Sequence, residues 1–310
     1  MPQLQLGFHT SFALKKDDII RILEAATEDQ GLNDSLENLI DRTKLGNKKV
    51  GPMRSWAIRS GLVSGDRLSP EGAIAWKYDF GVKPENRSRD YNDRIIPVTD
   101  WLMHFYLSLG VQGAKDDRKS KYTGVGETLQ PPPTDPAEWG GWTYFVYAFL
   151  PDHKTFTLDE LQTYCASIFA PGTGKHPEKD LRDNLRIVLR AYCEPEAIAG
   201  CKFLAQTDKE AYTAEDSDLP NLDLMAYFLA KLWQRDFSDA TSVLTDDILQ
   251  QPMGLASVLG VNTSTLQTVL NQLETAALIE QRRTVSPAQI IRRWHDPLTL
   301  LEKSYTHSLS

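Results

Sequence analysis

DSLENLIDRTKLGNKKVGPMRSWAIRSGLVSGDRLSPEG, residues 34–72, contains two helical patterns followed by a predicted hairpin. Residues 34–45 place apolar side chains three and four apart behind a capping Asp34, which is typical of an amphipathic helix. Residues 47–63 repeat this spacing, and a turn at 64–66 separates a short strand from a return through Leu68 and Ile74. A further helical pattern, DDIIRILEAATE, precedes the stretch. Three short helices and a hairpin predict a winged helix-turn-helix.

The same stretch is strongly basic although the chain is acidic. Between Arg42 and Arg67 there are seven Lys or Arg and one Asp, a net charge of +6, whereas the whole chain carries −8. Such an asymmetry is typical of a nucleic-acid-binding surface in an otherwise acidic protein. The alternative is that these side chains only solvate a helix surface. The residues expected to contact DNA phosphates are Lys48, Lys49, Arg54 and Arg59.

A second module of the same architecture is predicted at the other end of the chain. Residues 242–294 contain a helix, a shorter helix, a Gly-Val turn and a third helix that Asn262 or Thr263 can cap. A wing follows, with no acidic residue from 281 to 295. The four wing residues expected to bind phosphates are Arg282, Arg283, Arg292 and Arg293.

The segment between the two modules reads as a helical core. Its apolar helical patterns lie at 97–110, 155–170, 178–193 and 222–237, and the aromatic run 139–150 and His104 are expected inside the core. The predicted fold is mainly α, a helical core flanked by N- and C-terminal winged helix-turn-helix-like modules. Its predicted parts are 1–96, 97–237 and 238–310, with a polar linker at 81–96 and a long loop at 111–138.

Composition excludes several classes of protein. The chain has 310 residues, of which 41% are apolar and 25% charged, enough to build a sizeable core. No apolar run reaches the length of a membrane-spanning helix, and the first residues do not form a secretory signal. The three cysteines have no C-x-x-C spacing, so a reducing cytoplasm is the expected compartment.

No motif identifies a catalytic centre. PGTGKH (171–176) lacks the first Gly and the final Ser or Thr of a P-loop, so we exclude nucleotide binding there. The six histidines show no metal-binding pair at helical spacing. Glu178, Lys179 and Asp180 are weak candidates because metal nucleases use carboxylates with a lysine. The alternative for these acids is simple capping of a helix. His9 is an outside candidate. If the chain cleaved DNA it could use Mg²⁺ or Mn²⁺ held by carboxylates, or an activated nucleophile.

Several segments together resemble a known bacterial family. In chain order they are GFHTSFALK (7–15), GNKKVGPMRSWAIRSGLV (46–63), LSPEG (68–72), DWLMHFYL (100–107), WTYFVYAF (142–149), TFTLDEL (155–161), DLRDNLRIVLRAY (180–192), LPNLDLMAYFLAKLW (219–233) and the C-terminal helical module. This ordered series resembles the family named domain of unknown function 4007. The long loop 111–138 is a departure from it.

The resemblance implies a role in bacterial DNA phosphorothioation, the exchange of a non-bridging backbone oxygen for sulfur. It implies double-stranded DNA as a partner, together with an ATPase, a cysteine desulfurase and a sulfurtransferase of the same system. One family member is described as a DNA-nicking component, but no active-site motif carries over to this sequence. Two other functions stay open: a winged-helix transcription regulator, and a protein–protein scaffold without DNA chemistry.

Overall fold

The computed structural model describes residues 12–87, 89–109, 129, 141–170, 175–214, 218–238, 240–284 and 286–307. Its helices are α1 (Lys16–Thr27), α2 (Leu36–Thr43), α3 (Asn47–Arg59), α4 (Pro70–Ala75), α5 (Arg89–Leu109), α6 (Gly141–Tyr144), α7 (Leu158–Ile168), α8 (Pro177–Cys193), α9 (Leu222–Phe237), α10 (Thr245–Leu249), α11 (Leu255–Leu259), α12 (Thr263–Thr275) and α13 (Pro297–His307). The mainly helical class predicted from the sequence is confirmed.

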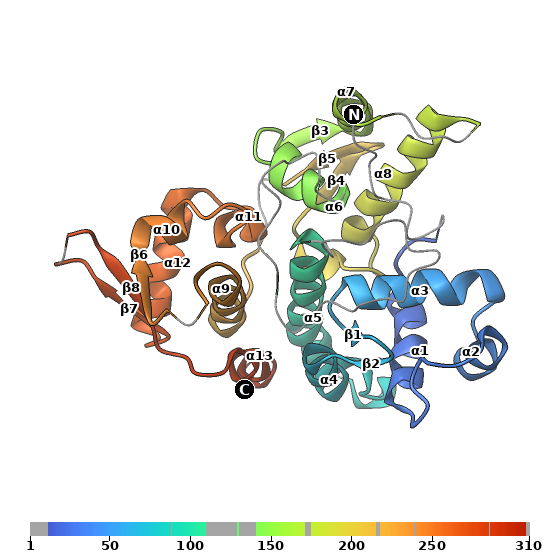
Figure 1. The fold of residues 1–310 in the computed structure, drawn as a ribbon. Coiled ribbons are helices and arrows are strands. Elements are labelled where there is room, and N and C mark those ends of the chain that lie inside the picture. The colour runs from blue at the N-terminus through green and yellow to red at the C-terminus, as the bar shows by residue number, and fades with distance from the viewer. Residues whose placement is uncertain are drawn as a thin grey trace.

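Three small antiparallel sheets accompany the helices (Figure 1). Their strands are β1 (Val63–Ser64), β2 (Arg67–Leu68), β3 (Thr155–Thr157), β4 (Ala205–Asp208), β5 (Ala211–Thr213), β6 (Ser242–Leu244), β7 (Ile279–Arg282) and β8 (Gln289–Arg292). β1 pairs with β2, β5 lies between β3 and β4, and β8 lies between β6 and β7. In the last sheet Val243 faces Ile290 across one pair and Gln281 faces Ile290 across the other, which fixes the register of the C-terminal hairpin.

Two of the helix caps predicted from the sequence are confirmed, and a third is shifted by one residue. Thr157 and Glu160 form the predicted capping box of α7, and Asn262 accepts the Thr265 N–H at the start of α12. At α2 the cap is Ser35, one residue after the predicted Asp34. The predicted return strand is wrong beyond Leu68, because Ser69 caps a helix over Pro70–Ala75. The predicted linker 81–96 is also wrong in its second half, since α5 begins at Arg89.

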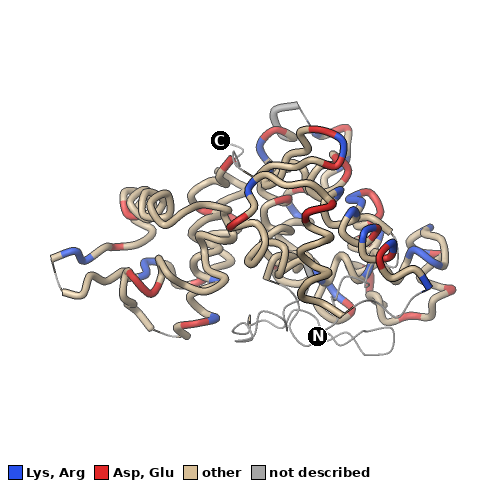
Figure 2. The backbone as a smooth tube through the Cα atoms, turned by 90° about the horizontal axis from the view of Figure 1, so that it is seen from above, with Lys and Arg blue, Asp and Glu red and all other residues tan. Residues whose placement is uncertain are grey.

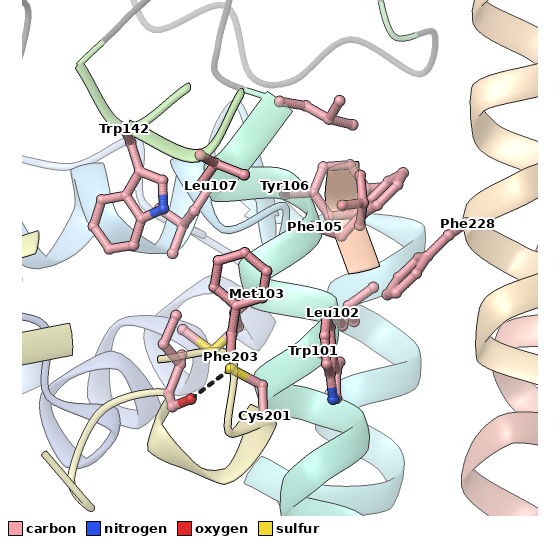
Figure 3. Close-up of a cluster of buried hydrophobic side chains, with 14 of the residues drawn as sticks. Trp101, Leu102, Met103, Phe105, Tyr106, Leu107, Trp142, Cys201, Phe203 and Phe228 are labelled. Carbon is pink, nitrogen blue, oxygen red and sulfur yellow. Dashed lines mark hydrogen bonds between the residues drawn. The ribbon is translucent and has the colours of Figure 1, made fainter. Parts of the chain in front are cut away.

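Helix α5 is the centre of the molecule (Figures 1 and 3). It lies between the N-terminal helices and the unit built from α9–α12 and β6–β8. Phe105 stacks on Phe228 of α9 with ring centroids 4.4 Å apart, and Trp101 meets Phe203 edge to face. The aromatic run beginning at Trp142 lies in the core, as predicted. Aromatic contacts also join this centre to the other two regions, because Trp56 meets Trp142 and Trp233 meets Trp294 edge to face.

His104 is the predicted core histidine. It is fully buried, and its ring nitrogens lie 2.8 Å from the Tyr192 hydroxyl and 2.9 Å from the Val258 carbonyl oxygen. Because a carbonyl only accepts, Nε2 donates to Val258 and Nδ1 accepts from Tyr192. Burial lowers the pKa of His104 to about 4. The ring is therefore a neutral structural bridge between α5, α8 and α11.

A buried polar cluster joins α4, α5 and α9. Glu71 Oε1 accepts hydrogen bonds from the Tyr106 hydroxyl at 2.9 Å, the Tyr227 hydroxyl at 2.9 Å and Lys231 Nζ at 3.2 Å. The two hydroxyls are 2.7 Å apart. Burial acts to raise the pKa of Glu71, but the Lys231 ammonium and the donors around it bring that pKa below its ordinary value. Glu71 is therefore an ionised carboxylate inside the fold.

A second buried ion pair holds the N-terminal helix to the centre. Asp100 of α5 is fully buried, with Oδ1 2.8 Å from Lys16 Nζ and Oδ2 2.8 Å from the Gly200 N–H. Burial raises the pKa of Asp100 to about 6, although the positive charge of Lys16 acts to lower it. This carboxyl therefore titrates well above an ordinary Asp.

We expect the substitution Asp100→Asn to gain stability relative to wild type as pH rises. The raised pKa means that the folded protein retains this proton up to about pH 6, whereas the ordinary value is 3.8. The group therefore lowers the wild-type free energy of unfolding as pH rises through this window. Asparagine does not titrate, so the difference between variant and wild type should move in the variant's favour by about 2–2.5 kcal/mol between pH 4 and 7. Urea unfolding at both pH values measures it, and a pH-independent difference would contradict it.

The last helix, α13, packs against both the central and the N-terminal parts of the fold. α13 packs on α9 and α4, with Tyr305 buried and stacked on Tyr78 at 5.6 Å between centroids. Glu302 pairs with Lys77 at 2.6 Å. Removing the C-terminal residues would therefore expose the core of the N-terminal region, so point substitutions are the appropriate test of the C-terminal unit.

Candidate nucleic-acid interface

Helix α12 and the β7–β8 hairpin form the exposed end of the C-terminal unit. Along the chain the unit runs β6, α10, α11, α12, β7 and β8, and the hairpin projects away from the body (Figure 1). The predicted inward face of α12 is confirmed, because its four residues are at most 1% exposed: Leu266, Val269, Leu270 and Leu273. The rest of the helix surface is therefore free to face solvent.

The outward surface of α12 is polar and almost uncharged. The sequence TSTLQTVLNQLET has Glu274 as its one charged residue. We call the residues spaced along one side of it the polar stripe; they are exposed and comprise Ser264, Thr268, Asn271 and Thr275. Solvated helix faces usually carry Lys, Glu and Arg, which also favour the helix, whereas Thr and Asn do not. The stripe therefore bears hydroxyl and amide groups at a cost in helix propensity.

The hairpin is bonded to this helix through a network of amides. Asn271 Oδ1 accepts from Gln267 Nε2 at 3.1 Å, Gln281 Nε2 at 3.1 Å and the Arg283 guanidinium at 2.9 Å. Glu274 accepts from Arg283 at 2.7 Å and from the Gln281 N–H at 2.7 Å. Burial opposes ionisation of Glu274, but these donors lower its pKa below the ordinary value. Helix and hairpin thus form one connected surface.

The four predicted wing arginines all lie on or beside this hairpin, where Figure 2 shows a concentration of basic residues. Arg282 and Arg293 both pair with Glu280, and Arg283 pairs with Glu274. Arg282, Arg283 and Arg293 keep more than half of their side-chain area exposed, while Arg292 is half-buried. Four arginines against two glutamates leave a net positive hairpin next to an uncharged stripe.

The four predicted N-terminal contacts are not gathered in the same way. Lys48 is exposed in the first turn of α3, but Lys49 pairs with Asp18 at 2.5 Å. Arg54 donates to the Leu32 and Gly65 carbonyl oxygens, both at 3.2 Å, and so joins α3 to the hairpin turn. Arg59 is half-buried. Most of α3 after Gly51 lies in the core, so the helix offers solvent little beyond its first turn.

The central candidates are exposed and are not grouped with one another. Glu178 and Asp180 are exposed acids in the first turn of α8, where acids favour the helix dipole. Lys179 Nζ is 3.8 Å from Asp183. Three arginines farther along α8 are paired with acidic side chains. Arg182 and Arg186 share Glu210, and Arg190 pairs with Glu194 at 2.5 Å. In the part of the chain that the structure describes, no three His, Cys, Asp or Glu side chains are grouped to hold a metal ion.

His9 lies outside the described residues, and so does most of the predicted loop 111–138. The polar stripe and the amides that support it were not predicted from the sequence. The available signal was the ten-residue run TSTLQTVLNQ, an amphipathic helix without a single charge. Within the described ranges, no helix is both long and apolar enough to cross a membrane.

Two solved crystal structures share the fold of this chain. They are SspB and magnesium ion-bound SspB, each with a TM-score of 0.64 and 13% sequence identity. Each comparison covers 99% of this chain and 89% of the other. No protein-family model and no curated protein matches the sequence. The likeness therefore shows the overall fold, and membership of the family that the sequence resembles stays a prediction.

Proposed function

We propose that this chain is the DNA-binding component of a bacterial DNA phosphorothioation system. In this proposal α12 and the β7–β8 hairpin act as the recognition helix and wing of a winged helix-turn-helix. The observation that carries it is the uncharged polar stripe beside a hairpin with four arginines, in a chain whose net charge is −8. Arginines supply phosphate contacts, and a hydroxyl and amide surface can enter a groove without charge repulsion.

The phosphorothioation role draws on two supports. The ordered sequence resemblance implies it, and the fold shared with SspB over nearly the whole chain agrees with that resemblance. The partners proposed with it are an ATPase, a cysteine desulfurase and a sulfurtransferase. The N-terminal unit would add the phosphate contact of Lys48.

Nicking is not assigned to a residue. One SspB structure is a magnesium-bound form, but the described part of this chain offers no cluster of ligating side chains for such an ion. Glu178 and Asp180 are exposed and lie beside arginines that are already paired with other acids. We therefore propose DNA binding for this chain and derive no catalytic step from it.

The test is the salt dependence of binding to a labelled random-sequence duplex, measured by fluorescence anisotropy on the full chain. Four phosphate contacts predict an affinity loss of roughly 10²-fold between 50 and 200 mM salt. The fourfold variant Arg282→Gln, Arg283→Gln, Arg292→Gln and Arg293→Gln should bind weakly and with a shallow slope. A control that removes four exposed charges elsewhere should keep the wild-type slope: Lys179→Gln, Arg190→Gln, Lys202→Gln and Lys303→Gln.

Absence of salt-sensitive binding would overturn the proposal and favour a protein–protein scaffold. Normal binding by the hairpin variant would contradict the assignment to α12 and the hairpin. A footprint confined to one operator would favour a transcription regulator.

A further inference from the structure

Asn271 occupies a special place in the polar stripe. It is exposed, and it is the member of the stripe whose side chain also belongs to the amide network under the hairpin. The inference developed from it rests on the proposed function, since it concerns which base the same surface would contact.

The orientation of the Asn271 amide is fixed by chemistry. Arginine carries only donors, so the group that faces the Arg283 guanidinium at 2.9 Å must be the amide oxygen. Gln267 and Gln281 add donors to the same oxygen, each at 3.1 Å. Glu274 in turn holds Arg283 at 2.7 Å, so the guanidinium cannot easily leave. The oxygen of Asn271 is therefore saturated on the hairpin side.

The other half of the amide is left to solvent. Within the described ranges no hydrogen bond occupies Asn271 Nδ2, and the residue is exposed. A surface that approached this stripe would meet two N–H donors and no available acceptor at this position. Asparagine in DNA-binding proteins usually reads adenine with both its oxygen and its nitrogen, which a saturated oxygen prevents.

We propose that Asn271 reads guanine in the major groove of duplex DNA, as a donor-only amide held in place by Arg283. Guanine presents two adjacent acceptors, N7 and O6, whereas adenine presents one acceptor beside a donor, thymine one acceptor beside a methyl group, and cytosine a donor. A group with donors alone therefore favours guanine. Arg283 acts here as a positioning residue, because it holds the amide and need not touch the base.

The test is affinity selection of the full chain on a duplex pool with a randomised central segment, followed by binding measurements on the selected site. Wild type should enrich a guanine whose replacement by cytosine or adenine weakens binding by about 5- to 100-fold. Asn271→Asp keeps an oxygen for Arg283 and turns an acceptor outward, so it should select cytosine at that position. Arg283→Ala removes the donor that fixes the orientation of the amide, while Gln267 and Gln281 still donate to its oxygen. The preference for guanine should therefore weaken, with a general loss of affinity.

Two controls accompany the selection. Gln272→Glu adds the same negative charge as Asn271→Asp at the neighbouring position, outside the amide network. This control variant should still select guanine. An unchanged melting temperature of Asn271→Asp shows that the variant is folded, as expected at an exposed position. Salt-dependent binding without enrichment, or the same base selected by wild type and Asn271→Asp, would overturn this inference and leave the proposed function intact. Failure of wild type to bind any duplex would overturn both.

Discussion

Glu71→Gln is expected to lower the free energy of unfolding by about 3–5 kcal/mol. The substitution removes the negative charge that faces Lys231, and both side chains are at most 10% exposed. The lysine would then have to remain ionised without a partner in the core or lose its proton, and either costs free energy. Equilibrium unfolding in urea measures the change.

A double substitution tests whether the cost of Glu71→Gln arises from leaving Lys231 without a partner. Glu71→Leu with Lys231→Met removes both charges and fills the space with apolar groups, so it should recover most of the lost stability. Tyr106 and Tyr227 keep a partner in this variant because their hydroxyls are 2.7 Å apart. The matched surface pair, Lys202 with Asp218, has side chains 67% and 71% exposed, so Lys202→Ala should cost less than about 1 kcal/mol. A Glu71→Gln cost as small as that would contradict the buried-pair argument.

The parts of the fold that the sequence predicted well are those set by near neighbours. The capping box at Thr157 and the inward face of α12 depend on residues three or four positions apart, and each is present as expected. The aromatic run after Trp142 was assigned to the core because large rings are buried whatever covers them. Such signals need no knowledge of the tertiary structure.

The N-terminal net charge of +6 is partly balanced by acids once the chain is folded. The acids that neutralise it come from outside the segment 42–67: Lys49 pairs with Asp18, and Arg42 with Glu28 and Asp34. Arg54 is held by carbonyl oxygens. A net charge taken over a window of sequence cannot include partners that only folding brings near it.

The candidate site could be predicted from the sequence only in part. The arginines of the wing are visible in the sequence, but the role proposed for Asn271 depends on the contact of β7 with α12, which brings Gln281 and Arg283 to the helix. The uncharged run of α12 could have been noticed. The direction of one amide could not, because it depends on how closely β7 folds back against α12, which residue types alone do not determine.

Gly61→Ala should destabilise the protein by about 3–5 kcal/mol, from backbone strain and steric overlap together. Gly61 ends the helical pattern of α3 with φ of +76°, and a Cβ there would lie 2.4 Å from the Tyr106 ring. Gly65→Ala is the matched control. Its φ is +64° and its Cβ would meet no atom within 4 Å, so it should show only the backbone cost of about 1 kcal/mol. Equal losses from the two substitutions would contradict the overlap with Tyr106.

Gly61→Ala should also weaken the buried cluster, because the ring that it displaces carries one of the hydroxyls bonded to Glu71. Without that donor the Glu71 carboxylate is itself less well stabilised in the core, so removing its charge then costs less. The double variant Gly61→Ala with Glu71→Gln should therefore be more stable than the sum of the single losses by about 1–2 kcal/mol. Urea unfolding of the four proteins in this cycle gives the coupling. If the two losses of unfolding free energy were strictly additive, the Tyr106 ring would have moved away from the methyl group added at position 61 without displacing its hydroxyl. The close approach at Gly61 would then be independent of the ion pair that joins α4 to α9.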